Sequence, residues 1–152
     1  MSFQTGKARR QNFETFGAKD LINIVVVSHG NLGGALIRAA ELITGPAEGL
    51  YAVALLPGDS PEGFDRRLTA TMDSLVGQET LVLIDLFGGT PYNVAAHQVL
   101  KANVECVTGA NLPMLLELIM TREDASLPEL AASITQVGRE SIRNLGPLLR
   151  PA

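Results

Sequence analysis

The sequence predicts an α/β fold of three layers, in which helices cover both faces of a mainly parallel four-stranded sheet. Two observations lead to this prediction. Four apolar runs of strand length alternate with segments whose apolar residues recur at helical spacing. Strict alternation of strands and helices favours parallel strands joined by crossover helices. The length of 152 residues suits one compact domain.

The predicted strands are short apolar runs. They are LINIVVV (21–27), LYAVALL (50–56), ETLVLIDLF (79–87) and VECVTG (104–109). The first is almost continuously apolar and rich in β-branched residues, which is typical of a strand covered on both faces.

Helices are expected between and after these strands. They span residues 32–44, 64–76, 88–102, 110–122 and 126–145. Gly45 and Pro46 end the first helix, and Ser60 caps the second, with Pro61 in its first turn. The third follows a glycine turn.

The first twenty residues differ in character from the rest of the chain. Residues 1–20 are polar and aperiodic, and no apolar stretch follows their basic residues as it would in a secretory signal. We expect a leader there, flexible or vector-derived, or a short extra element. Residues 21–152 then form the single domain.

Composition excludes several classes of function. The net charge of −4 and the lack of Lys/Arg clusters argue against binding to nucleic acid or to anionic membranes. No apolar run is long enough to span a bilayer. The one cysteine forms no internal disulfide and fits a reducing compartment, and no metal site is expected. With 5% aromatic residues and no tryptophan, a flavin binder is disfavoured and no cofactor is expected.

The carboxyl ends of the strands carry the candidate chemistry, because ligands of parallel sheets bind there. His29 ends the first apolar run, and Asp85 lies at the end of the third. A carboxylate that holds one ring nitrogen as N–H leaves the other nitrogen of the imidazole free to act as a nucleophile. The pair therefore resembles the His–Asp half of a catalytic triad.

The turns next to this pair favour an anion. Helices begin after Gly30 and Asn31 and after Gly88 and Gly89, and helix N-termini present free N–H groups. Thr90 adds a hydroxyl donor. We expect these five residues to bind phosphate. The sequence has no nucleotide-binding loop of the G-x-x-x-x-G-K-[ST] type, so a nucleotide is not the expected phosphoryl donor.

Each candidate also has a purely structural interpretation. His29 could bond only to backbone, Asp85 could cap a helix, and the glycine pair could serve only as a turn. Phe87 is either core or an exposed partner contact, and Asn111 is an N-cap first and a partner-binding residue second. We expect His97 to be a surface or half-buried residue without function and Cys106 to be buried and inert.

Three blocks carry a family resemblance: IVVVSHGNLGGAL, LIDLFGGTPYNVA and VTGANLPMLLE. They resemble the mannose-type enzyme IIA (mannose/fructose/sorbose family) of the bacterial phosphoenolpyruvate-dependent sugar phosphotransferase system, over residues 21 to about 145. The resemblance implies that His29 is phosphorylated, that Asp85 is its hydrogen-bond partner and that Thr90 lines the phosphate site. It also fits a flavodoxin-like strand order.

The same resemblance implies partners and a location. A phosphotransferase of this type takes the phosphoryl group from the carrier HPr and passes it to a cognate enzyme IIB. Family members are cytoplasmic homodimers that exchange a C-terminal strand. Here SIRNLGPLL (141–149) is the candidate for a fifth, antiparallel strand, although Gly146 and Pro147 interrupt it. No IIB domain follows, so a separate IIA subunit is expected, with no direct membrane insertion.

Two alternative functions stay open. The phosphohistidine subunit of a dihydroxyacetone kinase has a similar domain, with a different phosphoryl acceptor. A regulatory module could accept phosphate without relaying it. The sequence does not identify the sugar, because a IIA subunit contacts proteins rather than the sugar.

Overall fold

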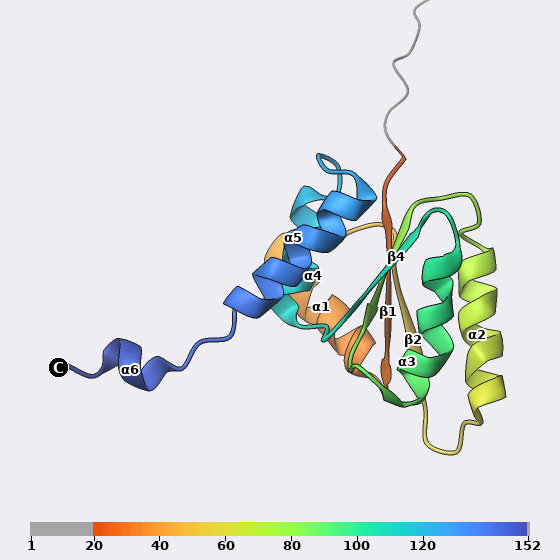
Figure 1. Ribbon diagram of the computed structural model, residues 1–152, viewed down its shortest axis with the longest axis horizontal. Helices are drawn as coiled ribbons and strands as arrows, with labels where there is room; N and C mark the ends of the chain where they lie inside the picture. Colours follow the sequence, from red (N-terminus) through yellow and green to blue (C-terminus); the bar gives the residue numbers. More distant parts are fainter. Residues whose placement is uncertain (1–19, 152) are drawn as a thin grey trace, which may run out of the picture.

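The computed structural model describes residues 20–151 and shows a four-stranded parallel sheet between layers of helices (Figure 1). The strands are β1 (Asn23–His29), β2 (Leu50–Leu55), β3 (Thr80–Ile84) and β4 (Val104–Thr108). Their order, β2-β1-β3-β4, is flavodoxin-like, and the predicted fold class is confirmed. The expected leader lies outside the described residues apart from Asp20.

The helices divide between the two faces of the sheet (Figure 1). On one face lie α1 (Leu32–Thr44), α4 (Leu112–Thr121) and α5 (Leu127–Glu140). The other face is covered by α2 (Pro61–Asp73) and by α3 (Gly89–Ala95) with the 3₁₀ turn η1 (Ala96–Leu100). The short helix α6 (Leu145–Leu149) lies apart from these layers.

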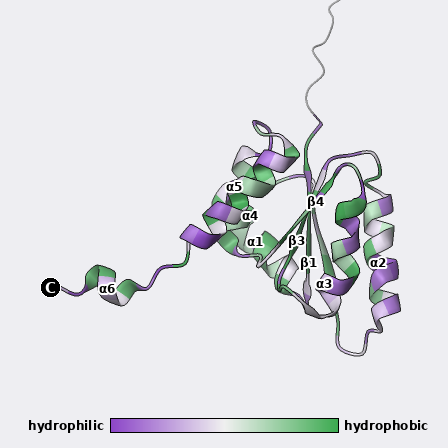
Figure 2. Cartoon of the chain, viewed as in Figure 1, coloured by the Kyte–Doolittle hydropathy of each residue, from purple (hydrophilic) through white to green (hydrophobic). Residues whose placement is uncertain are grey.

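Alternation along β1 decides which side chains enter each core. Ile24 and Val26 pack with α4 and α5, whereas Val25 and Val27 pack with α2. All four are fully buried, because a central parallel strand has helices on both sides. Figure 2 shows the resulting band of hydrophobic residues along the strands and the polar outer surface of α2.

Several element boundaries differ from the predicted ones. The ladder of β3 stops at Ile84, so residues 85–87 belong to a loop rather than to the strand. The predicted cap of the second helix is confirmed: the Ser60 side chain accepts a hydrogen bond from the Gly63 N–H at 3.1 Å, and the helix begins at Pro61, three residues before its predicted amphipathic segment. The third predicted helix changes to a 3₁₀ turn at Ala96, and the last ends at Glu140.

The C-terminal segment is helical in the single chain. Residues 145–149 form α6, which Asn144 caps by accepting from the Gly146 N–H at 3.2 Å. Its leucines Leu145, Leu148 and Leu149 are all exposed. The exchanged fifth strand requires a second chain, so it stays a prediction. Within residues 20–151, no helix is both long and apolar enough to cross a membrane.

A buried arginine joins the amino-terminal end of the sheet to the end of α4. Arg122 is 4% exposed, and its guanidinium donates to the carbonyl of Ile22 at 3.2 Å and to that of Glu48 at 2.6 Å. Burial lowers the pKa of this guanidinium from its usual value. These bonds link segments that are far apart in the chain.

Replacing this arginine should destabilise the domain without changing the contacts at the carboxyl ends of the strands. We expect Arg122→Met to reduce the free energy of unfolding by about 2–4 kcal/mol, because two charged hydrogen bonds are lost. Urea denaturation measures the change. Arg38→Met is the matched control, because Arg38 is exposed on α1. Equal stability of the two variants would contradict a structural role for Arg122.

Candidate functional site

The contact between His29 and Asp85 is the centre of the site. The Asp85 Oδ2 atom lies 2.8 Å from His29 Nδ1 and accepts the His29 backbone N–H at 2.9 Å. The carboxylate side chain is 8% exposed, whereas the imidazole is 49% exposed. One buried oxygen therefore holds both the main chain and the ring of a histidine that solvent and a partner can reach.

The sheet register brings these two residues together. Val27 of β1 pairs with Ile84 of β3, and the backbone N–H of Asp85 donates to the Val27 carbonyl at 3.0 Å. His29 thus lies two residues beyond the last pair of β1 with β3, and Asp85 begins the loop after β3. Residues 56 positions apart in sequence meet because parallel strands end at the same edge of the sheet.

The contact specifies the tautomer of the imidazole. An ionised carboxylate only accepts hydrogen bonds, so the proton of a neutral ring lies on Nδ1. The lone pair is then on Nε2, the ring nitrogen that does not contact Asp85. The other carboxylate oxygen, Oδ1, is buried and has no hydrogen-bond partner among the described residues. Chemically, this arrangement offers a nucleophilic nitrogen whose positive charge, once it reacts, is stabilised by Asp85.

Ser28 anchors the first helix to β1, a role that the sequence reasoning missed. Its buried hydroxyl accepts from the Gly33 N–H at 2.9 Å and donates to the Gly30 carbonyl at 3.1 Å. A Cβ on Gly33 would lie 3.0 Å from Val26 Cγ1, tighter than most Cβ contacts, so a glycine favours this close approach of α1. The sequence signal for this role is a polar residue, Ser28, between the apolar run and His29.

The loop after β3 turns on two consecutive glycines. Gly88 and Gly89 have φ angles of 93° and 84°, a region that other residues rarely adopt. A Cβ built on Gly89 would lie 3.7 Å from His29 Nε2, so this turn borders the reactive side of the ring. Thr90 follows in the first turn of α3, and within residues 20–151 the N–H groups of Gly89 and Thr90 have no hydrogen-bond partner.

The turn after β1 is used differently from the prediction. The Gly30 N–H, expected to face a phosphate, donates to the Leu55 carbonyl at 2.7 Å and so extends the β1–β2 ladder. Asn31 is the N-cap residue of α1, but its side chain makes no capping hydrogen bond and is exposed. Asn31 therefore keeps an unengaged side chain at the rim, whereas Gly30 contributes mainly its backbone conformation, with φ of 52°.

Large apolar side chains are exposed at the same edge of the sheet as the histidine. Phe87 is 75% exposed, and its ring centroid lies 4.8 Å from that of Tyr92. Further exposed apolar residues at the strand ends and the first turn of α1 are Leu32, Leu56 and Leu86. An apolar rim around an accessible reactive side chain is typical of a protein-docking surface.

Three other candidate residues make no contact with His29 or Asp85. Asn111 caps α4 by accepting from the Met114 N–H at 3.1 Å, and its amide donates to the Gly138 carbonyl at 3.4 Å. His97 is exposed in η1. Cys106 is half-buried rather than fully buried, and burial raises the pKa of its thiol to about 11. Across residues 20–151, no cluster of His, Cys, Asp and Glu could hold a metal ion.

An ion pair at the end of β2 also went unnoticed in the sequence. Asp59 and Arg67 are joined at 2.6 Å between Oδ2 and Nη2. The spacing of eight residues across a helix start carries no standard motif, so only the folded loop reveals the pair.

The model of the family described as "PTS system fructose IIA component" matches residues 23–135, which contain every candidate residue. This chain belongs to the mannose/fructose/sorbose-type IIA family. The match includes β1 to β4 and most of α5, and the initials PTS denote the phosphotransferase system.

Individual relatives of this IIA chain agree with the family match. It is 34% identical over 127 residues to the mannose-specific EIIAB component of Escherichia coli, covering 82% of this chain but only 39% of that protein. A fructose-specific EIIA component of Bacillus subtilis is 29% identical, with 81% of this chain and 86% of that protein covered.

Solved structures of IIA proteins share the fold. The IIA protein associated with the fucose utilization operon of Streptococcus pneumoniae is 32% identical and has a TM-score of 0.76, covering 88% of this chain and all of that one. The mannose/sorbose-specific IIA subunit of Enterococcus faecalis has a TM-score of 0.78 at 28% identity, covering 87% of this chain and 98% of that one.

The double contact of Asp85 leads to a test of the tautomer. In Asp85→Asn, the amide oxygen can still accept both N–H groups of His29, so we expect the fold to be kept. A neutral acceptor holds the Nδ1 proton less firmly than a carboxylate, so the Nε2–H tautomer should become more populated. Nitrogen-15 NMR of the imidazole measures this shift. Asp124→Asn, at an exposed position, is the control; an unchanged tautomer in Asp85→Asn would contradict the assignment.

Proposed function

We propose that this IIA chain is a phosphocarrier that accepts a phosphoryl group from phospho-HPr on His29 and passes it to a cognate enzyme IIB. One observation carries the proposal: a half-exposed imidazole has its Nδ1 engaged by a buried carboxylate at 2.8 Å and its Nε2 toward a glycine turn. The family match supplies the phosphotransferase context.

The transfer is a direct exchange between two histidines. The Nε2 lone pair of His29 attacks the phosphorus atom, and the N–P bond of the donor phosphohistidine breaks, returning its electron pair to the donor ring. The phosphorylated ring of His29 keeps its Nδ1 proton, and its positive charge faces the carboxylate of Asp85. Passage to IIB reverses this step, with a nucleophile of IIB as the attacking group.

The surrounding turns support an anion beside Nε2. The N–H groups of Gly89 and Thr90 and the Thr90 hydroxyl lie in the turn that borders the ring. Gly88 provides the left-handed conformation that leads into α3, and Asn31 adds an unengaged amide at the start of α1. Positioning and charge stabilisation of this kind are what phosphoryl transfer mainly requires.

Protein partners fit the apolar rim defined by Leu32, Leu56, Leu86 and Phe87. HPr and IIB use the same histidine in turn, so each must cover this edge of the sheet. We assign Phe87 as the main partner contact, since it is the most exposed member of the rim. Asn111 stays a prediction as a partner residue. A relay with these partners operates in the cytoplasm.

A homodimer is proposed for the C-terminal segment. The helix α6, with its exposed leucines, lies apart from the layers of the single chain, and Ile142 is also exposed. The edge strand β4 has only half-buried residues after Val104. A second copy that exchanges residues 141–149 would cover both surfaces. Sedimentation of the full chain and of Leu148→Asp should then show a dimer and a monomer, respectively.

The phosphocarrier function predicts a label that depends on one histidine. With phosphoenolpyruvate, enzyme I and HPr, the wild type and His97→Ala should take up acid-labile, base-stable phosphate, whereas His29→Ala should take up none. His29→Ala should unfold at nearly the same urea concentration as the wild type, because its side chain is half-exposed. Labelling of His29→Ala would contradict the proposal.

The fate of the label separates the related functions. Phosphate that leaves for a candidate IIB protein supports the sugar relay. Phosphate that leaves only for the partner subunits of a dihydroxyacetone kinase indicates that alternative. Phosphate that stays on the chain indicates a regulatory module.

The docking assignment predicts a rate effect at an exposed residue. Phe87→Ala should slow phosphorylation by phospho-HPr by about tenfold or more, because a central aromatic contact is lost. Stability should change little, since Phe87 is 75% exposed. Stopped-flow or quench measurements give the rate. Val76→Ala, at an 82% exposed position in the turn after α2, is the control, and equal rates for the two variants would remove Phe87 from the interface.

A further inference from the structure

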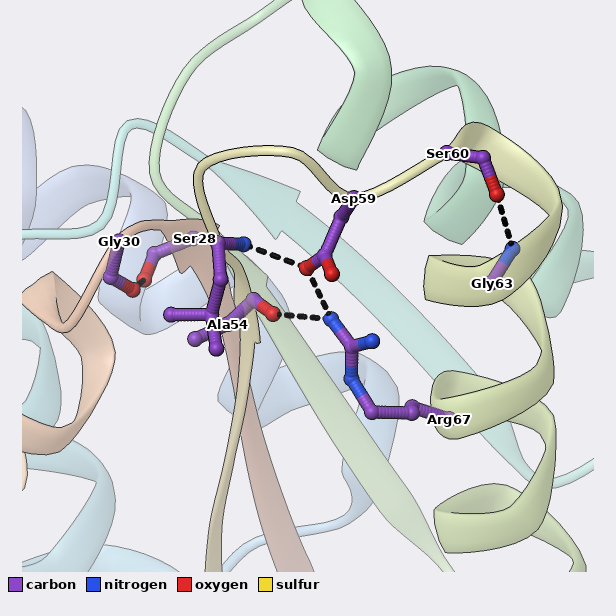
Figure 3. A network of polar contacts seen from close by, with 8 residues as sticks. Ser28, Gly30, Ala54, Asp59, Ser60, Gly63 and Arg67 are labelled. Carbon is purple, nitrogen blue, oxygen red and sulfur yellow. Dashed lines mark hydrogen bonds and ion pairs between the residues drawn. The ribbon is translucent and has the colours of Figure 1, made fainter.

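The ion pair between Asp59 and Arg67 lies at the carboxyl end of β2, beside the strand that carries His29. The Asp59 Oδ2 atom accepts the Leu56 N–H at 2.6 Å and the Arg67 Nη2 group at 2.6 Å. The same Nη2 donates to the Ala54 carbonyl at 2.7 Å (Figure 3). The carboxylate thus fixes both the loop after β2 and the guanidinium of a residue in α2.

The guanidinium and His29 lie on the same face of the sheet. In the ladder of β1 and β2, Ala54 is opposite Ser28 and Leu55 is opposite His29. Side chains of β1 alternate, and Val25 and Val27 pack against the α2 side. His29 continues that series, so its ring lies on the side of the sheet from which Arg67 reaches the strand end.

Arg67 has unused hydrogen-bonding capacity toward solvent. Its side chain is 44% exposed, and only Nη2 makes hydrogen bonds with the described residues. The N–H groups on Nε and Nη1 remain available, and a guanidinium matches the oxygens of a phosphoryl group in a bidentate manner. The arginine hydrogen bond lowers the pKa of Asp59, so this carboxyl is ionised at neutral pH.

Charge balance at the site calls for such a cation. The side chain bonded to His29 is a carboxylate, and phosphorylation adds further negative charge next to it. The N–H groups of the α3 turn are neutral dipoles. An arginine on the same face, held at the rim by an acidic residue, can offset that charge once the phosphoryl group arrives.

We propose that Arg67 binds the phosphoryl group on His29 and that Asp59 holds the guanidinium at the rim until the group is transferred. This inference rests on the proposed phosphocarrier function. In the free chain the arginine bonds to Asp59 and Ala54. In the phosphorylated chain, its guanidinium turns toward the phosphoryl oxygens on Nε2, and Asp59 keeps its bond to the Leu56 N–H.

The equilibrium constant for transfer of the phosphoryl group from phospho-HPr to His29 tests this assignment. A residue that only helps the partner to dock changes the forward and reverse rates together and leaves the constant unchanged. A residue that binds the phosphoryl group changes the constant itself. We expect Arg67→Ala to lower this equilibrium constant by about tenfold, because a charged partner of the phosphoryl group is lost. Arg67→Lys should lower it less, because lysine keeps the positive charge but not the bidentate geometry of the guanidinium. Arg66→Ala, the adjacent exposed arginine of α2, should leave it unchanged.

Asp59→Asn distinguishes phosphate binding from a merely structural ion pair. An asparagine can still accept the Leu56 N–H but competes less for the guanidinium, so the constant should equal or exceed that of the wild type. If the pair only held the loop, Asp59→Asn and Arg67→Ala would change the constant in the same direction. The phosphorus-31 chemical shift of the phosphorylated chain should move in Arg67→Ala and stay in Arg66→Ala.

The outcomes of this experiment are distinct. A constant in Arg67→Ala equal to that in Arg66→Ala overturns the inference, even if both exchange rates fall. A decrease in Asp59→Asn as large as in Arg67→Ala also overturns it. A wild-type chain that takes up no phosphate on residue 29 overturns the proposed function instead, before any variant is compared.

Discussion

The site depends on a single carboxylate oxygen that accepts two hydrogen bonds from one residue. Asp85 Oδ2 bonds both the backbone N–H and the ring Nδ1 of His29. This arrangement ties the direction of the ring to the end of β1, so the imidazole cannot turn independently of the sheet. The parallel pairing of β1 and β3 maintains it, because the N–H of Asp85 bonds to Val27 in the ladder. A half-exposed imidazole is thereby held by the buried strands of the sheet.

Rigid surroundings and an accessible nitrogen have to coexist at this edge. Ser28 and Gly33 draw α1 close to β1, and the left-handed glycines after β3 turn the chain without placing side chains over the ring. Apolar residues remain exposed beyond these turns. Their hydration is unfavourable in the free chain, and covering them favours association with a protein partner. The proposed chemistry and the proposed partner contacts therefore share one edge of the sheet.

Much of this arrangement could be predicted from the sequence, because it depends on local patterns. The apolar run that ends in His29 marks a central strand, and the helix over residues 32–44 has the predicted bounds. The partnership of His29 and Asp85 also followed, since both residues end apolar runs of a parallel sheet. The sequence predicted less well the backbone hydrogen bonds that depend on a neighbouring strand. The Gly30 N–H donates to Leu55, and the ladder of β3 ends at Ile84.

The sequence by itself determined the class of fold, the order of its elements and the residue types that meet at the carboxyl edge, because strand and helix periodicity are local properties of the chain. Only the tertiary structure decided which carboxylate oxygen holds His29, how Ser28 anchors α1, and that Asp59 and Arg67 form a pair beside the same strand end. Those contacts join segments through strand order, register and loop conformation. Such properties arise from packing across the sheet, and no spacing along the chain encodes them.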